Sequence, residues 1–198
     1  MTYPSPPWHM NAQMWLSLFR VRDTGPADRP PGLYGAAFVS YEAGSPLTYL
    51  ELLAARLLDP RRRQVRITDI WVDSPTSLEG GRSLWAIPKD LAKLDVDDRR
   101  LGPTSYTELS GDLDGRRIAA AQFAGLPGAA VVRAPFAAST SQLREGTGAE
   151  VVTSMTGSAR TLPALASWEF DPEGPLGFLH GRRPLASFRL TDLRLTFG

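Results

Sequence analysis

The sequence predicts a mainly β fold, an antiparallel sandwich or barrel with one or two short helices. Among its 198 residues, 18 glycines and 17 prolines separate short apolar runs, and short runs between turn residues favour strands over long helices. Several of these runs also alternate apolar and polar residues or are rich in β-branched side chains. Because no linker composition divides the chain, we expect one domain spanning residues 1–198.

The expected strands are the apolar runs that lie between turn signals. They cover residues 14–23, 33–44, 64–74, 164–170 and 185–198. The connection 25–32 is expected to be a loop, and 59–63 a turn with a solvated arginine tip. Residues 137–161 are too weakly patterned to assign.

Two local signals predict how strands are joined or bent. Asp114-Gly115 lies between two alternating segments, which is typical of a tight hairpin turn. In the last run the alternation slips by one residue at Thr191–Asp192, as a β-bulge requires. Residues 47–58, "LTYLELLAARLL", remain ambiguous at this level, because their Leu, Ala, Glu and Arg favour a helix by propensity.

Composition excludes several classes of function. The net charge of +1 gives no reason to expect a nucleic-acid or membrane-surface partner. The chain has no cysteine, and its two histidines lie far apart without metal-ligand spacing, so no metal site is expected. The start "MTYPSPPWHM" lacks the pattern of a signal peptide, and no apolar run is long enough to span a membrane. We therefore expect a cytoplasmic protein.

The segment "GGRSLWAIPKDLAKL", residues 80–94, contains the only two lysines of the chain, Lys89 and Lys93. A neutral amine attacks a carbonyl and forms a Schiff base, whose protonated iminium accepts electrons from a breaking bond. Arginine cannot replace it, because its guanidinium stays protonated. We expect residues 84–87 to be a strand that runs into the interior, and Pro88 to open a short helix with Lys93 one turn after Lys89.

Burial, a helix N-terminus and a neighbouring ammonium would each lower the pKa of Lys89. The plain alternatives are a surface lysine at a strand end for Lys89 and an exposed helix residue for Lys93.

The run "WVDSPTSLEGGRSLWAIPKDL", followed by "GDLDGRRIAAAQF", resembles the acetoacetate decarboxylase family. The matching features are an acidic strand end at Asp73, Gly81-Arg82, Pro88-Lys89, and a Gly-x-Leu-Asp motif that ends at Asp114. The resemblance covers about residues 49–123 and is weaker elsewhere. It implies a closed, cone-like antiparallel β-barrel whose interior holds the active lysine, and it therefore makes residues 47–58 largely strand.

The resemblance also implies site residues. Lys89 matches the Schiff-base position, and Tyr49 and Glu51 match a Tyr-x-Glu motif whose glutamate points into the cavity. Glu51 is the candidate proton shuttle, with an exposed edge-strand carboxylate as its alternative. Arg82 is a candidate for binding a substrate carboxylate, or else a brace that pairs with Asp73 or Asp69.

Trp85, Tyr49 and Trp71 are expected as pocket or core walls. One departure concerns the residue after the lysine. The decarboxylase has a second lysine there, whereas this chain has Asp90, which would raise the pKa of Lys89 unless it faces solvent. Lys93 is the remaining candidate for the missing cation.

The residues and the resemblance together predict a lyase that needs neither metal nor organic cofactor. Lys89 would form a Schiff base with a small β-keto or other oxo acid and assist decarboxylation, or a related aldol or dehydration step. One alternative is a cyclase or isomerase of a larger metabolite that acts without a Schiff base. Another is a non-catalytic ligand-binding barrel. The apolar strands would also suit assembly into a homo-oligomer.

Overall fold

The computed structural model describes residues 3–22, 29–101, 104–125 and 133–198. Its two helices in this part of the chain are α1 (Pro75–Trp85) and the 3-10 turn η1 (Gly177–Leu179). The strands are β1 (Trp8–Val21), β2 (Gly32–Tyr41), β3 (Tyr49–Asp59), β4 (Gln64–Val72), β5 (Lys89–Leu91), β6 (Lys93–Leu101), β7 (Thr104–Leu113), β8 (Arg116–Gly125), β9 (Arg133–Leu143), β10 (Glu150–Phe170) and β11 (Ala186–Phe197). The prediction of a mainly β chain with one or two short helices is confirmed.

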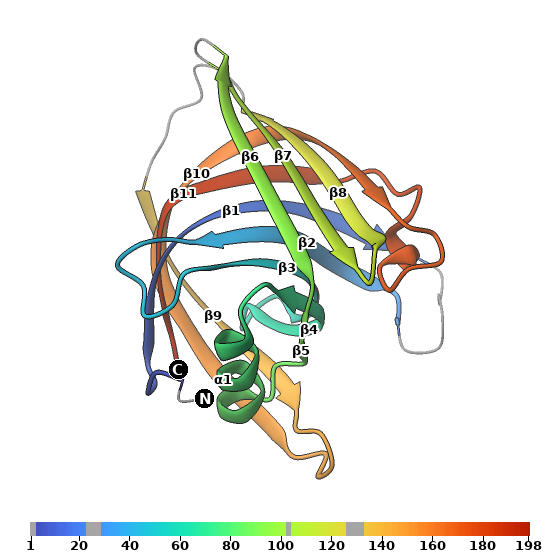
Figure 1. The fold of residues 1–198 in the computed structure, drawn as a ribbon. Coiled ribbons are helices and arrows are strands. Elements are labelled where there is room, and N and C mark those ends of the chain that lie inside the picture. The colour runs from blue at the N-terminus through green and yellow to red at the C-terminus, as the bar shows by residue number, and fades with distance from the viewer. Residues whose placement is uncertain (1–2, 23–28, 102–103, 126–132) are drawn as a thin grey trace.

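The strands form one sheet whose hydrogen bonding returns on itself. The order runs β11-β1-β2-β3-β4-β9-β10, and β10 also pairs with β11. The second half of β10 pairs with β8, from which β7 and β6 continue the sheet. Most pairings are antiparallel as predicted, but β4 pairs in parallel with both β5 and β9. Figure 1 shows α1 at one end of this ring, beside β4 and β5.

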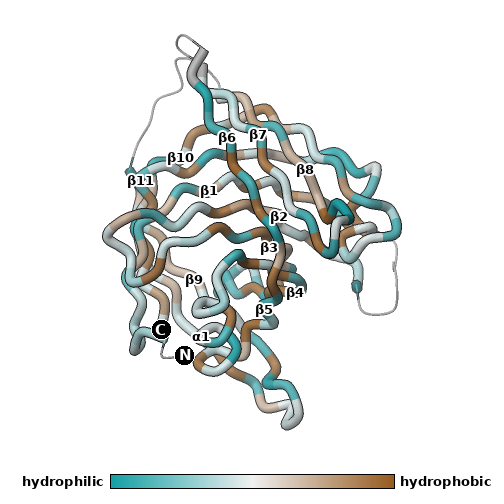
Figure 2. The backbone as a smooth tube through the Cα atoms, in the orientation of Figure 1, coloured by the Kyte–Doolittle hydropathy of each residue, from teal (hydrophilic) through white to brown (hydrophobic). Residues whose placement is uncertain are grey.

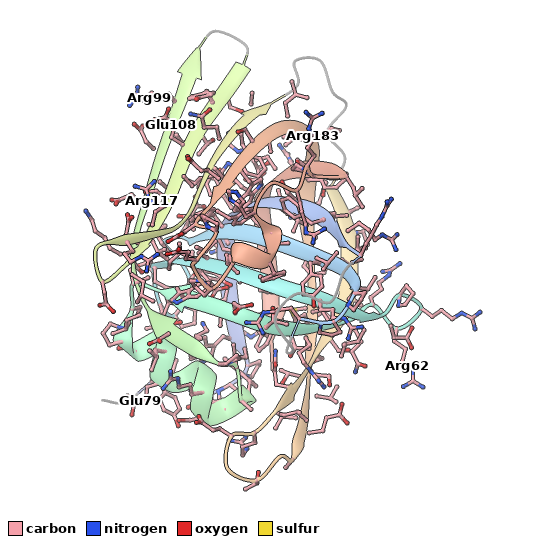
Figure 3. The ribbon with its side chains drawn as sticks, turned by 90° about the vertical axis from the view of Figure 1, so that its right-hand side faces the viewer. Arg62, Glu79, Arg99, Glu108, Arg117 and Arg183 are labelled. Atoms are coloured by element: carbon pink, nitrogen blue, oxygen red, sulfur yellow. The ribbon has the colours of Figure 1, made fainter. Side chains whose placement is uncertain are left out.

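The two faces of the ring strands pack into two different cores, as β3 illustrates. Tyr49 and Leu53 belong to or pack against an apolar cluster that also contains Trp85 of α1. The alternate residues Leu52 and Ala54 belong to a second cluster, which is shared with β7 and β8. This period-two division is the signature of a strand, and Figure 2 shows hydrophobic stretches running through the middle strands of the sheet. The strand assignment for 47–58 that the resemblance implied is confirmed against helix propensity.

Both local signals in the sequence are confirmed. Asp114 and Gly115 join β7 to β8 with positive φ angles of 51° and 79°, as the tight hairpin turns with two left-handed residues require. In β11 the register to β1 shifts between Leu190 and Leu193, so the extra residue of the bulge lies where the alternation slips. The arginine tip also holds: Arg62, between β3 and β4, is 79% exposed and projects away from the molecule.

Two regions differ from the sequence prediction. The weakly patterned residues 137–161 lie mostly in β9 and β10, and the run 164–170 is only the end of the 21-residue β10. Much of the predicted loop 25–32 lies outside the described residues. Within the part of the chain that the structure describes, no helix has the length and apolar character needed to span a membrane.

The predicted helix after Pro88 is wrong. The helix lies upstream, where Ser74 caps its first turn by accepting a hydrogen bond from the Ser77 amide, and Pro75 opens it. It ends at Ala86, whose φ of 54° is left-handed. The segment after Pro88 instead forms β5 and β6. Residues 84–87, predicted as a strand, are therefore the end of α1 and the turn that follows it.

Candidate active site

The side chain of Lys89 is buried between β3 and α1. Lys89 is the first residue of β5 and pairs with Ile70 of β4. Its Nζ donates to Ser77 Oγ at 2.8 Å, to Glu51 Oε2 at 3.0 Å and to Tyr49 OH at 3.3 Å. The side chains of Lys89 and Glu51 are only 4% and 5% exposed. The three donors of an ammonium group thus have three acceptors, and its charge has a partner.

The local structure explains why these groups meet. Tyr49 and Glu51 are two residues apart on one strand, so both side chains point to the same face of β3. Ser77 and Gly81 are four residues apart in α1 and therefore lie on one face of the helix. A Cβ atom at Gly81 would be 2.7 Å from Cδ and 2.8 Å from Cε of Lys89. Glycine at this position therefore makes room for the lysine stem.

The electrostatics of the site differ from the prediction. Burial disfavours the charged amine and lowers the pKa of Lys89, but the charges and hydrogen bonds of Glu51 and Tyr49 outweigh it, so the pKa lies above its ordinary value. The expectation of a lowered pKa is therefore wrong for the free protein. The pKa is raised rather than lowered because the Glu51 carboxylate lies 3.0 Å from the amine, and because the helix expected after Pro88 is absent.

Lys93 does not supply a second cation to this site. Its side chain is 77% exposed on β6, where Nζ lies 3.8 Å from Asp95 Oδ2. Asp90 is exposed as well, and its Oδ1 accepts a hydrogen bond from the Leu91 amide. Since consecutive residues of a strand point to opposite faces, Asp90 faces solvent while Lys89 faces inward. The carboxylate that acts on Lys89 is thus Glu51.

Arg82 lies outside this group of side chains. Arg82 is exposed, and its Nε donates a hydrogen bond to the backbone oxygen of Lys89 at 2.6 Å. Neither of the carboxylates considered as its partners takes part: Asp69 pairs with Arg29, and Asp73 accepts from the Leu50 amide. The structure therefore gives Arg82 a bracing contact that ties α1 to β5.

Trp85 is part of an aromatic wall. It is buried and packs edge-to-face against Trp8 at 4.8 Å and Phe197 at 4.6 Å between ring centroids. Tyr49 belongs to the same apolar cluster, whereas the buried Trp71 belongs to the cluster on the opposite face of the ring strands. Trp85 thus belongs to the apolar cluster that includes Tyr49, whose hydroxyl contacts the Lys89 amine.

Two residues of the site were missed by sequence reasoning. Tyr41 donates to Glu51 Oε1 at 3.3 Å and lies against Tyr49 with ring centroids 4.4 Å apart. Burial, together with the charge of Glu51, raises the pKa of Tyr41 well above its ordinary value, so the phenol stays neutral. The pairing of β2 with β3 could have indicated Tyr41, because Tyr41 is directly opposite Tyr49 in that pair of strands. Ser77, the other missed residue, carried no sequence signal of its own.

A cleft of about 510 Å³ lies between the start of α1 and the β7–β8 turn. Its charged lining residues are Asp73, Lys93, Asp112 and Asp114. Pro75 and Leu91 also line it, each two residues along the chain from Ser77 and Lys89 respectively. Lys89 is not among its lining residues. The cleft is therefore lined by neighbours of Ser77 and Lys89 along the chain, but it does not contain the amine.

Comparison with known proteins identifies the fold. No protein-family model matches the chain, and no curated protein matches it by sequence. A solved structure of the enduracididine biosynthesis enzyme MppR complexed with pyruvate is 16% identical, covers all of this chain and 89% of its own, and has a TM-score of 0.68. Acetoacetate decarboxylase from Legionella pneumophila is 15% identical over all of this chain and 86% of its own, with a TM-score of 0.65.

A third solved structure, an acetoacetate decarboxylase-like enzyme from Sphingomonas wittichii RW1, is 14% identical over 95% of this chain and 92% of its own, with a TM-score of 0.63. The chain therefore has an acetoacetate decarboxylase-like fold, and these structural neighbours are enzymes. The resemblance inferred from the sequence is confirmed at the level of the fold.

Proposed function

We propose that the protein is an enzyme in which Lys89 condenses with a carbonyl substrate to form a Schiff base. The observation that carries this proposal is the buried amine, held within 2.8–3.3 Å of a carboxylate and two hydroxyl groups. Such an arrangement supplies a nucleophile and groups that move protons within hydrogen-bond reach of it. The resulting iminium assists decarboxylation of a β-keto acid, or a related aldol or dehydration step.

The raised pKa of Lys89 assigns the first step to Glu51. The resting amine is an ammonium, and Glu51 Oε2 at 3.0 Å takes one of its protons as the carbonyl compound arrives. The neutral amine then attacks the carbonyl carbon and gives a carbinolamine. Glu51, now a carboxylic acid, protonates the carbinolamine oxygen, which leaves as water. The products are a positively charged iminium on Lys89 and the Glu51 carboxylate, so the net charge of the pair is unchanged.

The surrounding residues orient this pair. Tyr41 donates to Glu51 Oε1, which leaves Oε2 directed at Lys89 Nζ. Ser77 and Tyr49 hold the amine from two further directions, and their hydroxyl groups are in place to pass a proton to the carbinolamine oxygen. We also propose that the strand ring forms the closed, cone-like barrel expected from the resemblance, which would keep bulk water away from the iminium.

The structural neighbours support this choice of chemistry. MppR is solved with pyruvate, and also with the condensation product of pyruvate and imidazole 4-carboxaldehyde. Pyruvate is an oxo acid, and the second ligand is formed from pyruvate and an aldehyde, so both MppR structures hold ligands of carbonyl chemistry in a chain of similar fold.

Reductive trapping tests the proposal directly. The protein is incubated with carbonyl compounds and borohydride, and the modified residue is located by mass spectrometry of peptides. We expect a stable adduct on Lys89, while Lys93, the only other lysine, serves as an exposed internal control. Equal labelling of both lysines, or labelling of Lys93 alone, would rule out an activated Lys89.

The variant Lys89→Ala separates the alternative functions. Turnover of a metabolite by this variant would point to a cyclase or isomerase that needs no Schiff base. Ligand binding without turnover in the wild type would point to a binding protein. Circular dichroism of the variant controls for loss of the fold.

A further inference from the structure

We infer that the substrate carbonyl compound is electrically neutral, an aldehyde or ketone without a carboxylate. This inference rests on the proposed Schiff-base function and narrows its substrate class. Decarboxylation requires a carboxylate on the substrate, so a neutral substrate assigns the iminium to aldol or dehydration chemistry instead.

The charges of the site already balance without a substrate. The Lys89 ammonium and the Glu51 carboxylate pair at 3.0 Å, and the other groups that touch Nζ are the hydroxyls of Ser77 and Tyr49. Because the iminium keeps the positive charge of the lysine, this balance persists through condensation. A substrate carboxylate would bring one unpaired negative charge into a buried region.

Among the described residues, no arginine and no second lysine forms a hydrogen bond or ion pair with Lys89 Nζ, Glu51 or the Tyr49 hydroxyl. The guanidinium of Arg82 is on the exposed side, bonded to the backbone oxygen of Lys89, and Lys93 pairs with Asp95 in solvent. The charged groups with the largest effects on the pKa of Lys89 and Tyr49 are each other and Glu51, with no arginine among them. A substrate carboxylate would therefore find no guanidinium bonded to the groups around Lys89 that could bind it with two hydrogen bonds.

The surroundings disfavour anions as well. The wall beside the site is an apolar cluster that includes Trp85, Ile70 and Val72. The cleft beside the start of α1 is lined by Asp73, Asp112, Asp114 and Lys93. Asp112 pairs with Arg117 at 2.7 Å and Lys93 lies near Asp95, so Asp73 and Asp114 carry the negative charge that these pairs do not balance. A negative surface at this position lowers the local concentration of anionic molecules.

With a neutral substrate, the Lys89–Glu51 pair still completes the later steps. The iminium makes its neighbouring C–H acidic, and the Glu51 carboxylate takes that proton to give a neutral enamine and a carboxylic acid. The enamine carbon then attacks the carbonyl carbon of a second aldehyde, and Glu51 gives its proton to the alkoxide that forms, which restores an iminium on Lys89 and the Glu51 carboxylate. Where the enamine carries a β-hydroxyl group, Glu51 instead protonates it, water leaves and an unsaturated iminium forms. Both branches conserve charge without any group beyond Lys89 and Glu51.

Levulinate and methyl levulinate test the inference. They differ in charge, but the ester lies two methylene groups from the ketone, so their carbonyl reactivity is nearly equal. A simple alkylamine, trapped in parallel with borohydride, controls for any remaining difference. The readout is the concentration of each compound that gives half-maximal trapping at Lys89.

We expect methyl levulinate to trap Lys89 at a concentration at least about tenfold lower than levulinate. An upper bound of a few hundredfold follows because roughly one part in 500 of an ordinary carboxylic acid is protonated at about pH 7 and can enter as the neutral form. For the same reason the preference should shrink as the pH is lowered toward about 5. In Glu51→Gln the charge of Lys89 loses its partner, so the preference should move toward levulinate.

The outcomes separate the two proposals. Equal or better trapping by levulinate at Lys89 would overturn the neutral-substrate inference and leave the Schiff base intact. No adduct at Lys89 with either compound, while the alkylamine reacts, would overturn the proposed function and the inference with it.

Discussion

The ion pair between Lys89 and Glu51 allows a quantitative test by a double-mutant cycle. Nζ and Oε2 are 3.0 Å apart, and both side chains are almost fully buried. At this separation two unit charges attract each other by about 5 kcal/mol when the effective dielectric constant is near 20. That attraction is offset by the desolvation of both ions, so the pair as a whole contributes little, but each partner depends strongly on the other.

We expect Lys89→Met and Glu51→Leu each to lower the free energy of unfolding by about 3–5 kcal/mol, because each leaves one buried charge unpaired. For a chain of this size, the midpoint of thermal unfolding should then fall by roughly 6–20 °C. The double variant removes both charges and loses only about 1–3 kcal/mol, chiefly through the hydroxyl groups of Ser77, Tyr49 and Tyr41 that lose a partner. The cycle should therefore give a coupling energy of several kcal/mol.

Urea unfolding at constant pH, followed by tryptophan fluorescence and circular dichroism, measures all four free energies. The reasoning is refuted if the two single variants each cost less than about 1 kcal/mol and their effects add. That result is typical of an exposed ion pair, and it would mean that the two groups are not buried together.

Three further predictions follow from the same site. Lys89, Tyr49 and Tyr41 all have raised pKa values in the folded protein. Their contribution to the free energy of unfolding is therefore complete below about pH 10 and is lost as the pH rises through the folded pKa values. Unfolding free energies that stay constant up to about pH 11 would contradict this prediction. Gly81→Ala should gain about 1 kcal/mol of stability from helix propensity but lose about 1–3 kcal/mol by crowding the stem of Lys89, and it should slow imine trapping. In the Lys89→Ala background this crowding should disappear. A loss of stability that persists there would show that the cost of Gly81→Ala does not come from the lysine stem. Lys93→Ala should change stability by no more than about 0.5 kcal/mol and leave trapping at Lys89 intact, and a loss of trapping would give Lys93 the role that its exposure argues against.

Much of the fold could be predicted because it is encoded locally. Asp114-Gly115 and the bulge at Thr191–Asp192 are set by a few neighbouring residues, and both occur where the sequence places them. The helix was misplaced for a physical reason: Gly80 and Gly81 weaken helix propensity, yet α1 needs them for close approach to Trp8 and to Lys89. The Ser74-Pro75 pair was the overlooked signal for its start.

By itself, the sequence determined the strand periodicity, the turns and the choice of a lysine after Pro88, because these depend on residues close together in the chain. Only the tertiary structure decided the charge state of that lysine. Glu51 and Ser77 are 38 and 12 residues away from Lys89 in sequence, and they reach its amine through β3 and α1. The sign of a pKa shift depends on which charge is nearest in space, and folding brought a carboxylate to Lys89 rather than a second ammonium.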